Sequence, residues 1–228
     1  MKTLLRSFWL ASAVFGLSAA AFASDPAPIR YAVAFKGMPV ATQSVTIVQS
    51  AGRKTISTAF TADLPVFVAT HHYSEQLSVT IGPGGTVERL AAIRNDGPVH
   101  TLVSGSLEAD GRLRIVREDP GGVATNWIRR GDYDFHSLAL YGAAPEDFLG
   151  TNQPARVLSV AEGRVLSVAI QAIAESDTFE RQHLRSRHVV WTEGSHISHS
   201  WHPERFSELP RRYVRQTDSG EFSFTLIR

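Results

Sequence analysis

QLSVTIGPGG, residues 76–85, is the stretch of this chain that most directly indicates how it folds. Leu77, Val79 and Ile81 alternate with polar residues. A period of two is typical of a β-strand with one buried face and one wetter face. The glycines and the proline that follow favour a tight turn, because glycine adopts positive φ and proline fixes its own φ. The stretch therefore predicts one arm of an antiparallel hairpin and the turn that ends it.

The same combination of alternation and turn repeats on both sides of this stretch. Upstream, Tyr31, Val33 and Phe35 alternate with smaller or charged residues. Further turn signals stand at residues 95–98, 109–112, 119–122, 160–165, 193–194 and 218–220. This rhythm is expected of a large antiparallel sheet or barrel. A sheet of about ten or more strands curls or closes to protect its edges, and a curled sheet has a concave face that can hold a ligand.

Residues 133–157 interrupt the strand pattern. Residues 136–141 read HSLALY and predict a short helical turn, and residues 144–149 predict another. We therefore expect a mainly β protein: a single curled antiparallel sheet, an open half-barrel, with a short helical crossover insert around 133–157. Because no long linker divides the chain, residues 24–228 are expected to form one domain.

The N-terminus has the pattern of an export signal. Lys2 and Arg6 precede an apolar run at residues 8–22, and residues 21–23 read AFA, the small-x-small pattern of a cleavage site. The run is shorter than the roughly 20 residues that span a bilayer. We expect residues 1–23 to be a signal peptide cleaved near Ala23, which would leave a periplasmic chain without a membrane span.

The amino-acid composition excludes several classes of function for this protein. The 228 residues include no cysteine, which excludes disulfides, thiolate metal ligands, thiol nucleophiles and a lipidated N-terminal cysteine. Removing Lys2 and Arg6 from the 23 basic residues leaves 21 against 22 acidic ones, a net charge of −1. This balance argues against a nucleic-acid partner, which usually selects a strongly basic surface.

Several segments resemble a family of uncharacterised periplasmic proteins. These segments are YAVAFKGMPV at residues 31–40, the middle stretch 137–165, and the closing stretch from Trp201 to Ile227, which includes LPRRY at 209–213. The resemblance implies an open, curled antiparallel half-barrel similar to that of the periplasmic lipoprotein-carrier proteins, which bind acyl chains on the concave face. Without an anchoring cysteine, this chain resembles the soluble member of that carrier system.

A row of arginines is the candidate site for a ligand headgroup. Arg181, Arg185 and Arg187 share one face of a predicted strand. Guanidinium groups bind carboxylate or phosphate through paired hydrogen bonds. The alternative is a solvated face that pairs with nearby acidic side chains.

Three tryptophans are candidates for the lining of an acyl groove. Trp127, Trp191 and Trp201 lie in predicted strands and offer large apolar surfaces. The alternative is that they pack in a filled core, because sequence does not separate a core from an empty groove of the same polarity.

The C-terminal histidines are the candidate ligands for Zn²⁺ or Cu²⁺. His196, His199 and His202 are spaced three apart, and neutral imidazole binds both metals. Residues three apart on a regular strand face opposite sides, so this set forms a site only if a bulge or turn breaks the strand. The alternative is a polar hairpin edge.

A second candidate metal set alternates in the chain. Asp132, Asp134 and His136 would share one face of an extended strand and could bind a cation. The alternative is that one of the aspartates caps the predicted helical turn.

The sequence favours a binding protein over an enzyme. It contains no GxSxG elbow and no nucleophile–base pair at a meaningful spacing. We expect an exported protein that holds an apolar or amphipathic ligand, such as an acyl chain or a lipid, without a cofactor. The alternatives are a periplasmic metal-binding protein and a scaffold whose sheet edges bind another exported protein.

Overall fold

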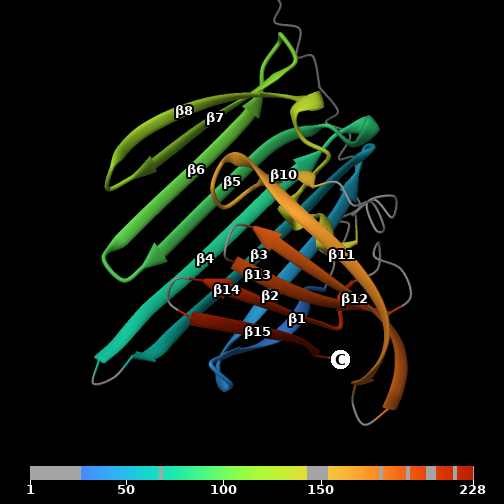
Figure 1. Cartoon of the computed structure of the whole chain (residues 1–228). Coiled ribbons are helices and arrows are strands. Elements are labelled where there is room, and N and C mark those ends of the chain that lie inside the picture. The colour runs from blue at the N-terminus through green and yellow to red at the C-terminus, as the bar shows by residue number, and fades with distance from the viewer. Residues whose placement is uncertain are drawn as a thin grey trace, which may run out of the picture.

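One sheet of fifteen strands organises the chain (Figure 1). The computed structural model describes residues 27–66, 69–142, 154–179, 182–193, 196–203, 209–217 and 220–227. The strands of the first half are β1 (Ile29–Phe35), β2 (Met38–Ser50), β3 (Arg53–Val66), β4 (Ala69–Ile81), β5 (Val87–Asp96), β6 (Val99–Leu107), β7 (Arg112–Asp119) and β8 (Gly122–Arg129). Those of the second half are β9 (Phe135–His136), β10 (Ala155–Ser159), β11 (Arg164–Phe179), β12 (Gln182–Glu193), β13 (His196–His202), β14 (Arg212–Thr217) and β15 (Gly220–Ile227).

The strand order shows how the two halves of the chain join. It runs β8-β7-β6-β5-β4-β3-β2-β1-β15-β14-β13-β12-β11-β10-β9. The first strand pairs with the last, antiparallel, from Arg30 opposite Ile227 to Phe35 opposite Phe222. The only parallel pair among the described strands is β9 with β10, so the sheet is mixed. Because β8 and β9 stand at opposite ends of the order, the sheet is open. The predictions of a mainly β chain and of one large open sheet are confirmed.

The prediction of a helical insert around 133–157 is wrong. Three short 3-10 turns are the only helical elements in the described part: η1 (Pro83–Gly85), η2 (Arg130–Asp132) and η3 (Ser137–Tyr141). Gly142 ends η3 in the left-handed conformation, with φ of 95°, and donates its N–H to Ala139 O, so the turn stops within five residues. The expected helical turn at 144–149 lies outside the described residues.

The sheet curls so strongly that side chains from distant strands meet across its concave face. Phe60 on β3 packs edge-on against Phe222 on β15 at 6.0 Å between ring centroids. Tyr73 on β4 lies 5.4 Å from the same Phe222 ring. Together with Tyr31 and Phe35 these aromatic side chains are buried. The main apolar core therefore fills the inside of the curl, where it joins side chains from both ends of the chain.

The turn between β10 and β11 packs against strands β6 to β8 of the other half of the sheet (Figure 1). Asn126 Nδ2 on β8 donates to Gly163 O at 3.2 Å. A Cβ atom on Gly163 would lie 2.8 Å from a methyl carbon of Val103 and 2.8 Å from one of Ile115. This turn thus fits tightly against the far half of the sheet and brings the two halves together.

No helix in the described part of the chain is long and apolar enough to cross a membrane. The predicted signal peptide, residues 1–23, lies outside the described residues.

Replacing Gly163 by alanine tests the contact that brings the halves together. Gly163→Ala should destabilise the fold in urea unfolding by about 2–5 kcal/mol, because the methyl group overpacks the contact with Val103 and Ile115 and the left-handed backbone disfavours alanine. Gly111→Ala is the matched control: its φ is +79°, and a Cβ atom added there would have no neighbour within 4 Å. The control should lose only the about 1–2 kcal/mol of backbone strain. Equal losses in both variants would contradict the packed turn.

Candidate functional site

A groove of about 330 Å³ runs between the two halves of the curled sheet. On one side it is lined by residues of β2 to β5, on the other by residues of β10 to β14, and η3 contributes Ser137, Leu140 and Tyr141. Apolar lining comes from Leu77, Val157, Leu166, Val168 and Trp191. This is the volume of a small-molecule pocket at the lower end of the about 300–1,000 Å³ range.

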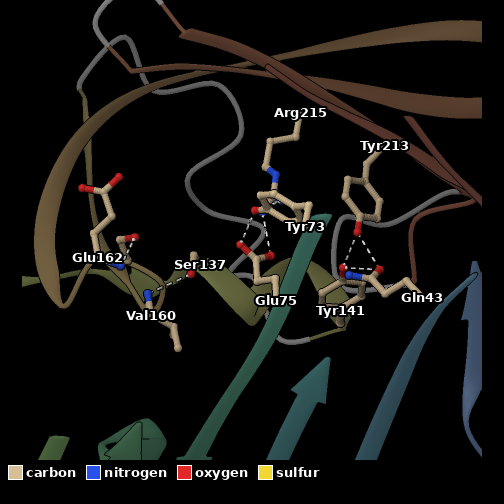
Figure 2. Close-up of polar contacts among 10 residues, drawn as sticks. Gln43, Tyr73, Glu75, Ser137, Tyr141, Val160, Glu162, Tyr213 and Arg215 are labelled. Carbon is tan, nitrogen blue, oxygen red and sulfur yellow. Dashed lines mark hydrogen bonds and ion pairs between the residues drawn. The ribbon is translucent and has the colours of Figure 1, made fainter. Parts of the chain in front are cut away.

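The polar part of the groove is centred on the carboxylate of Glu75. Alternation on β4 turns Glu75 toward the concave side together with Tyr73 and Leu77, and Glu75 is only 2% exposed. Arg215 Nη1 on β14 donates to Glu75 Oε2 at 2.9 Å, and the Tyr73 hydroxyl donates to Oε1 at 3.1 Å. Figure 2 shows these three side chains converging from opposite halves of the sheet.

The pKa values of the partners show how the carboxylate is held. Burial raises the pKa of the Tyr73 hydroxyl well above its ordinary value, so this group stays a proton donor. Burial alone would lower the pKa of Arg215, but the Glu75 carboxylate together with Tyr73 and Tyr213 outweighs this effect and raises it. Arg215 therefore stays charged over the physiological range.

A second guanidinium lies beside this pair. Arg94 on β5 stands directly opposite Glu75 in the strand register and also lines the groove. Within the described part of the chain, the Nε atoms of Arg94 and of Arg215 are buried without a hydrogen-bond partner. Two guanidinium groups flank the Glu75 carboxylate, and Glu162 and Glu193 also line the groove, so charges of both signs are present there.

The neighbouring wall is polar but uncharged. The Tyr213 hydroxyl donates to Gln43 Oε1 at 2.6 Å, and the Tyr141 hydroxyl lies 2.8 Å from the Tyr213 hydroxyl (Figure 2). Burial raises the pKa of both tyrosines, so both stay neutral. Because these groups satisfy one another, the wall is a rigid support and the charged groups beside it are the ones that remain under-satisfied.

His136 lies in β9, next to η3, and is a buried neutral imidazole. It is 5% exposed, and its Nδ1 has no hydrogen-bond partner among the described residues. Burial, and then the charge of Lys54, lower its pKa to about 4. Lys54 itself donates to Gly142 O at 2.8 Å, at the end of η3.

Most of the predicted arginine row lies outside the side chains that the structure describes. Arg181 lies outside the described residues, and for Arg185 only the backbone is described, paired with Ser176 on β11. Arg187 is partly buried on β12, opposite His202 on β13. Among the described side chains, the guanidinium groups that line the groove are those of Arg94 and Arg215.

The three tryptophans lie on different faces of the sheet. Trp191 lines the groove and donates its Nε1 to Ser200 Oγ at 3.2 Å. Trp127 is 47% exposed on β8 and stacks with the guanidinium of Arg112. Trp201 follows the buried, groove-lining Ser200 on β13 and so faces the other way.

The two described side chains of the histidine set, His199 and His202, do not come together. β13 pairs regularly with β12 from His196 to His202, so no bulge brings alternate faces together. His199 Nδ1 contacts His188 Nε2 at 3.0 Å, whereas His202 is fully buried and contacts Ser200 Oγ at 3.1 Å. The side chain of His196 lies outside the described part.

The second metal set is also separated. Asp134 accepts from Arg156 Nη2 at 2.6 Å and from the Arg156 backbone N–H. Asp132 accepts from the Arg129 N–H, so neither aspartate caps η3, whose N-cap is His136. Among the described residues, no group of three or more metal-ligating side chains comes together.

Sequence reasoning missed Glu75, Arg94 and Arg215, although a signal for them was present. Each occupies the buried phase of an alternating strand: Glu75 follows Tyr73 and precedes Leu77, and Arg215 follows Tyr213 at the same spacing. A charged residue at a core position is rare unless it is paired. That pattern could have singled out these positions as one buried network.

The lowered pKa of His136 predicts that the folded protein loses stability in mildly acidic solution. Because the unfolded imidazole has its ordinary pKa of 6.5 and the folded one a pKa of about 4, only the unfolded chain binds the proton between these values. Stability should therefore fall as the pH drops from 6.5 toward 4, by about 3 kcal/mol from this residue alone. Urea unfolding at several pH values measures the slope.

His136→Gln should unfold with a smaller acid slope than the wild type across this window. His72→Gln serves as the control, because the His72 side chain is 60% exposed. An unchanged slope in His136→Gln would show that the buried imidazole is not the group responsible.

Comparison of the chain with protein-family models, with curated proteins and with solved structures finds no match. The resemblance to periplasmic lipoprotein carriers therefore remains an expectation, and function has to be argued from the groove itself.

Proposed function

We propose that this chain is an exported, periplasmic binding protein that holds an amphipathic ligand in the groove on the concave side of its sheet. The observation that carries the proposal is the groove: about 330 Å³ remains open between the two halves of the sheet, beside the main apolar core. Its export rests on the signal pattern of residues 1–23.

The lining of the groove supports an amphipathic ligand. Leu77, Leu166, Val168 and Trp191 offer apolar surface to a chain or ring, and burying such surface yields about 25 cal/mol per Å². Glu75, Arg94 and Arg215 offer charged groups in the same groove. A ligand with an apolar body and a polar head satisfies both parts, whereas a purely polar ligand would leave the apolar lining wet.

The geometry favours binding over catalysis. The Glu75 carboxylate accepts hydrogen bonds from Arg215 and from Tyr73, and the groove tyrosines have raised pKa values. The charges and hydrogen bonds of these groups are fixed in position, as is typical of the polar end of a preorganised binding site.

Filling the groove should weaken binding of an apolar probe. The wild type should bind the uncharged fluorophore N-phenyl-1-naphthylamine saturably, and Leu166→Trp should weaken binding about tenfold or more because the larger side chain occupies the groove. Val123→Trp is the matched control, since Val123 is 70% exposed on β8. Fluorescence titration measures both.

Two results would contradict the proposal. One is a wild-type protein that shows no saturable binding of the probe. The other is Leu166→Trp binding the probe as tightly as Val123→Trp, which would place the probe outside the groove.

A further inference from the structure

Strand β8 forms one edge of the sheet, and its outer side is exposed. It stands at the end of the strand order and, among the described strands, pairs with β7 alone. Residues 122–127 are all exposed, and β8 lies at the outer edge of the molecule in Figure 1. The outer side of an edge strand carries a row of N–H and C=O groups that can pair with a further strand.

Strand β8 lacks the features by which proteins usually protect an edge. It is eight residues long, contains no proline and pairs with β7 without a bulge from Gly122 to Arg129. Its charged residue, Arg129, stands at the very end. The opposite edge of the sheet, β9, has only two residues. Because short strands, prolines, bulges and charges are what block edge pairing, β8 is the edge that is suited to receive another strand.

We propose that the strand added there is β8 of a second copy of this chain, paired antiparallel about a two-fold axis at Thr125. In this register Val123 of each copy lies opposite Trp127 of the other, and Thr125 lies opposite Thr125. Val123 is 70% exposed and Trp127 is 47% exposed, so both have apolar surface to bury. Pairs of an aromatic with a β-branched residue, and pairs of threonines, are cross-strand pairs that stabilise sheets.

The charges of the β7–β8 hairpin suit this antiparallel contact. Arg129 stands at one end of the hairpin and Glu118 at the other; both are exposed. The remaining acids of the hairpin accept hydrogen bonds from side chains within it, namely Glu108, Asp110 and Asp119. Antiparallel pairing brings the Arg129 end of each copy beside the Glu118 end of the other. Residues 122–128 pair, so no two like charges stand directly opposite each other.

The symmetry of the contact limits the assembly to two copies. The same strand serves on both sides, so the contact is isologous and each copy uses its exposed edge in forming it. The assembly is therefore a closed dimer with one continuous sheet, and the groove of each copy lies outside the contact.

Disulfide cross-linking tests the register. The chain contains no cysteine, so an introduced one is its sole thiol. Under mild oxidation Thr125→Cys should form a disulfide-linked dimer, because directly opposed residues of antiparallel strands have Cα atoms about 4.5–5.5 Å apart, within disulfide range. Val123→Cys is the matched control on the same face of the same strand. Its counterpart in the other copy would lie about 13 Å away along the strand, so it should stay monomeric.

Sedimentation of the purified protein tests the contact without a cross-link. The wild type should sediment as a dimer that dissociates on dilution. Thr125→Lys opposes two like charges at the axis and should weaken dimerisation about fivefold or more. Ser104→Lys is the control, because exposed Ser104 lies in the same row of the sheet, two strands from the edge, beyond Val116. Both lysine variants should bind N-phenyl-1-naphthylamine as the wild type does, which shows that they are folded.

Three results would overturn the proposed dimer. One is a wild type that stays monomeric at about 100 μM, which would leave the β8 edge to a strand of another protein. Another is a dimer that Thr125→Lys leaves as tight as Ser104→Lys does, which would place the contact elsewhere. The third is Val123→Cys cross-linking as fast as Thr125→Cys. None of these results would change the binding of the apolar probe in the groove.

Discussion

The ion pair between Glu75 and Arg215 is the interaction on which the arrangement of this molecule depends. The two residues lie on β4 and β14, which are separated in the sheet by β3, β2, β1 and β15. They can meet at 2.9 Å only because the sheet curls and turns both side chains inward. Breaking one partner of a buried ion pair typically costs about 3–5 kcal/mol. The pair therefore favours the curled form over any flatter arrangement of the same strands.

The same pair links the fold to the site. A core built only from apolar side chains would close the curl as well, but it would leave no charged end in the groove. Placing Glu75 and Arg215 inside makes the curl depend on this ion pair, and Arg94 adds a second guanidinium beside it. The tyrosines around Gln43 hold the neighbouring wall rigid without adding charge. In this view, a feature that constrains the fold also defines what the groove can bind.

Much of the architecture could be predicted from local sequence, because alternation and turn residues act within a few positions. Leu77, Val79 and Ile81 gave the correct strand and the correct buried face. The stretch 136–141 predicted part of a helical insert, whereas the structure has only the 3-10 turn η3. The reason is that Phe135 and His136 pair with β10 and that Gly142 ends η3. The local sequence pattern does not indicate which distant segments pair with one another.

The site was harder to predict for the same reason. Its members come from β4, β5 and β14, and residues 75 and 215 become neighbours only through the pairing of the first strand with the last. The arginine row stands out in the sequence because its residues are close together. Arg94 and Arg215 do not stand out, because each lies far along the chain from Glu75. Which strands face each other across a curl depends on the whole topology, and neither spacing nor composition specifies it.

A double-mutant cycle on Glu75 and Arg215 tests the central claim most directly. Urea unfolding of Glu75→Gln, Arg215→Gln and the double variant gives the coupling energy between the two side chains. If the ion pair holds the curl, the double variant should be less destabilised than the sum of the single variants by about 2 kcal/mol, and the exposed pair Arg164–Glu162 should couple by less than about 1 kcal/mol. Additive effects at Glu75 and Arg215, within about 0.5 kcal/mol, would contradict the account.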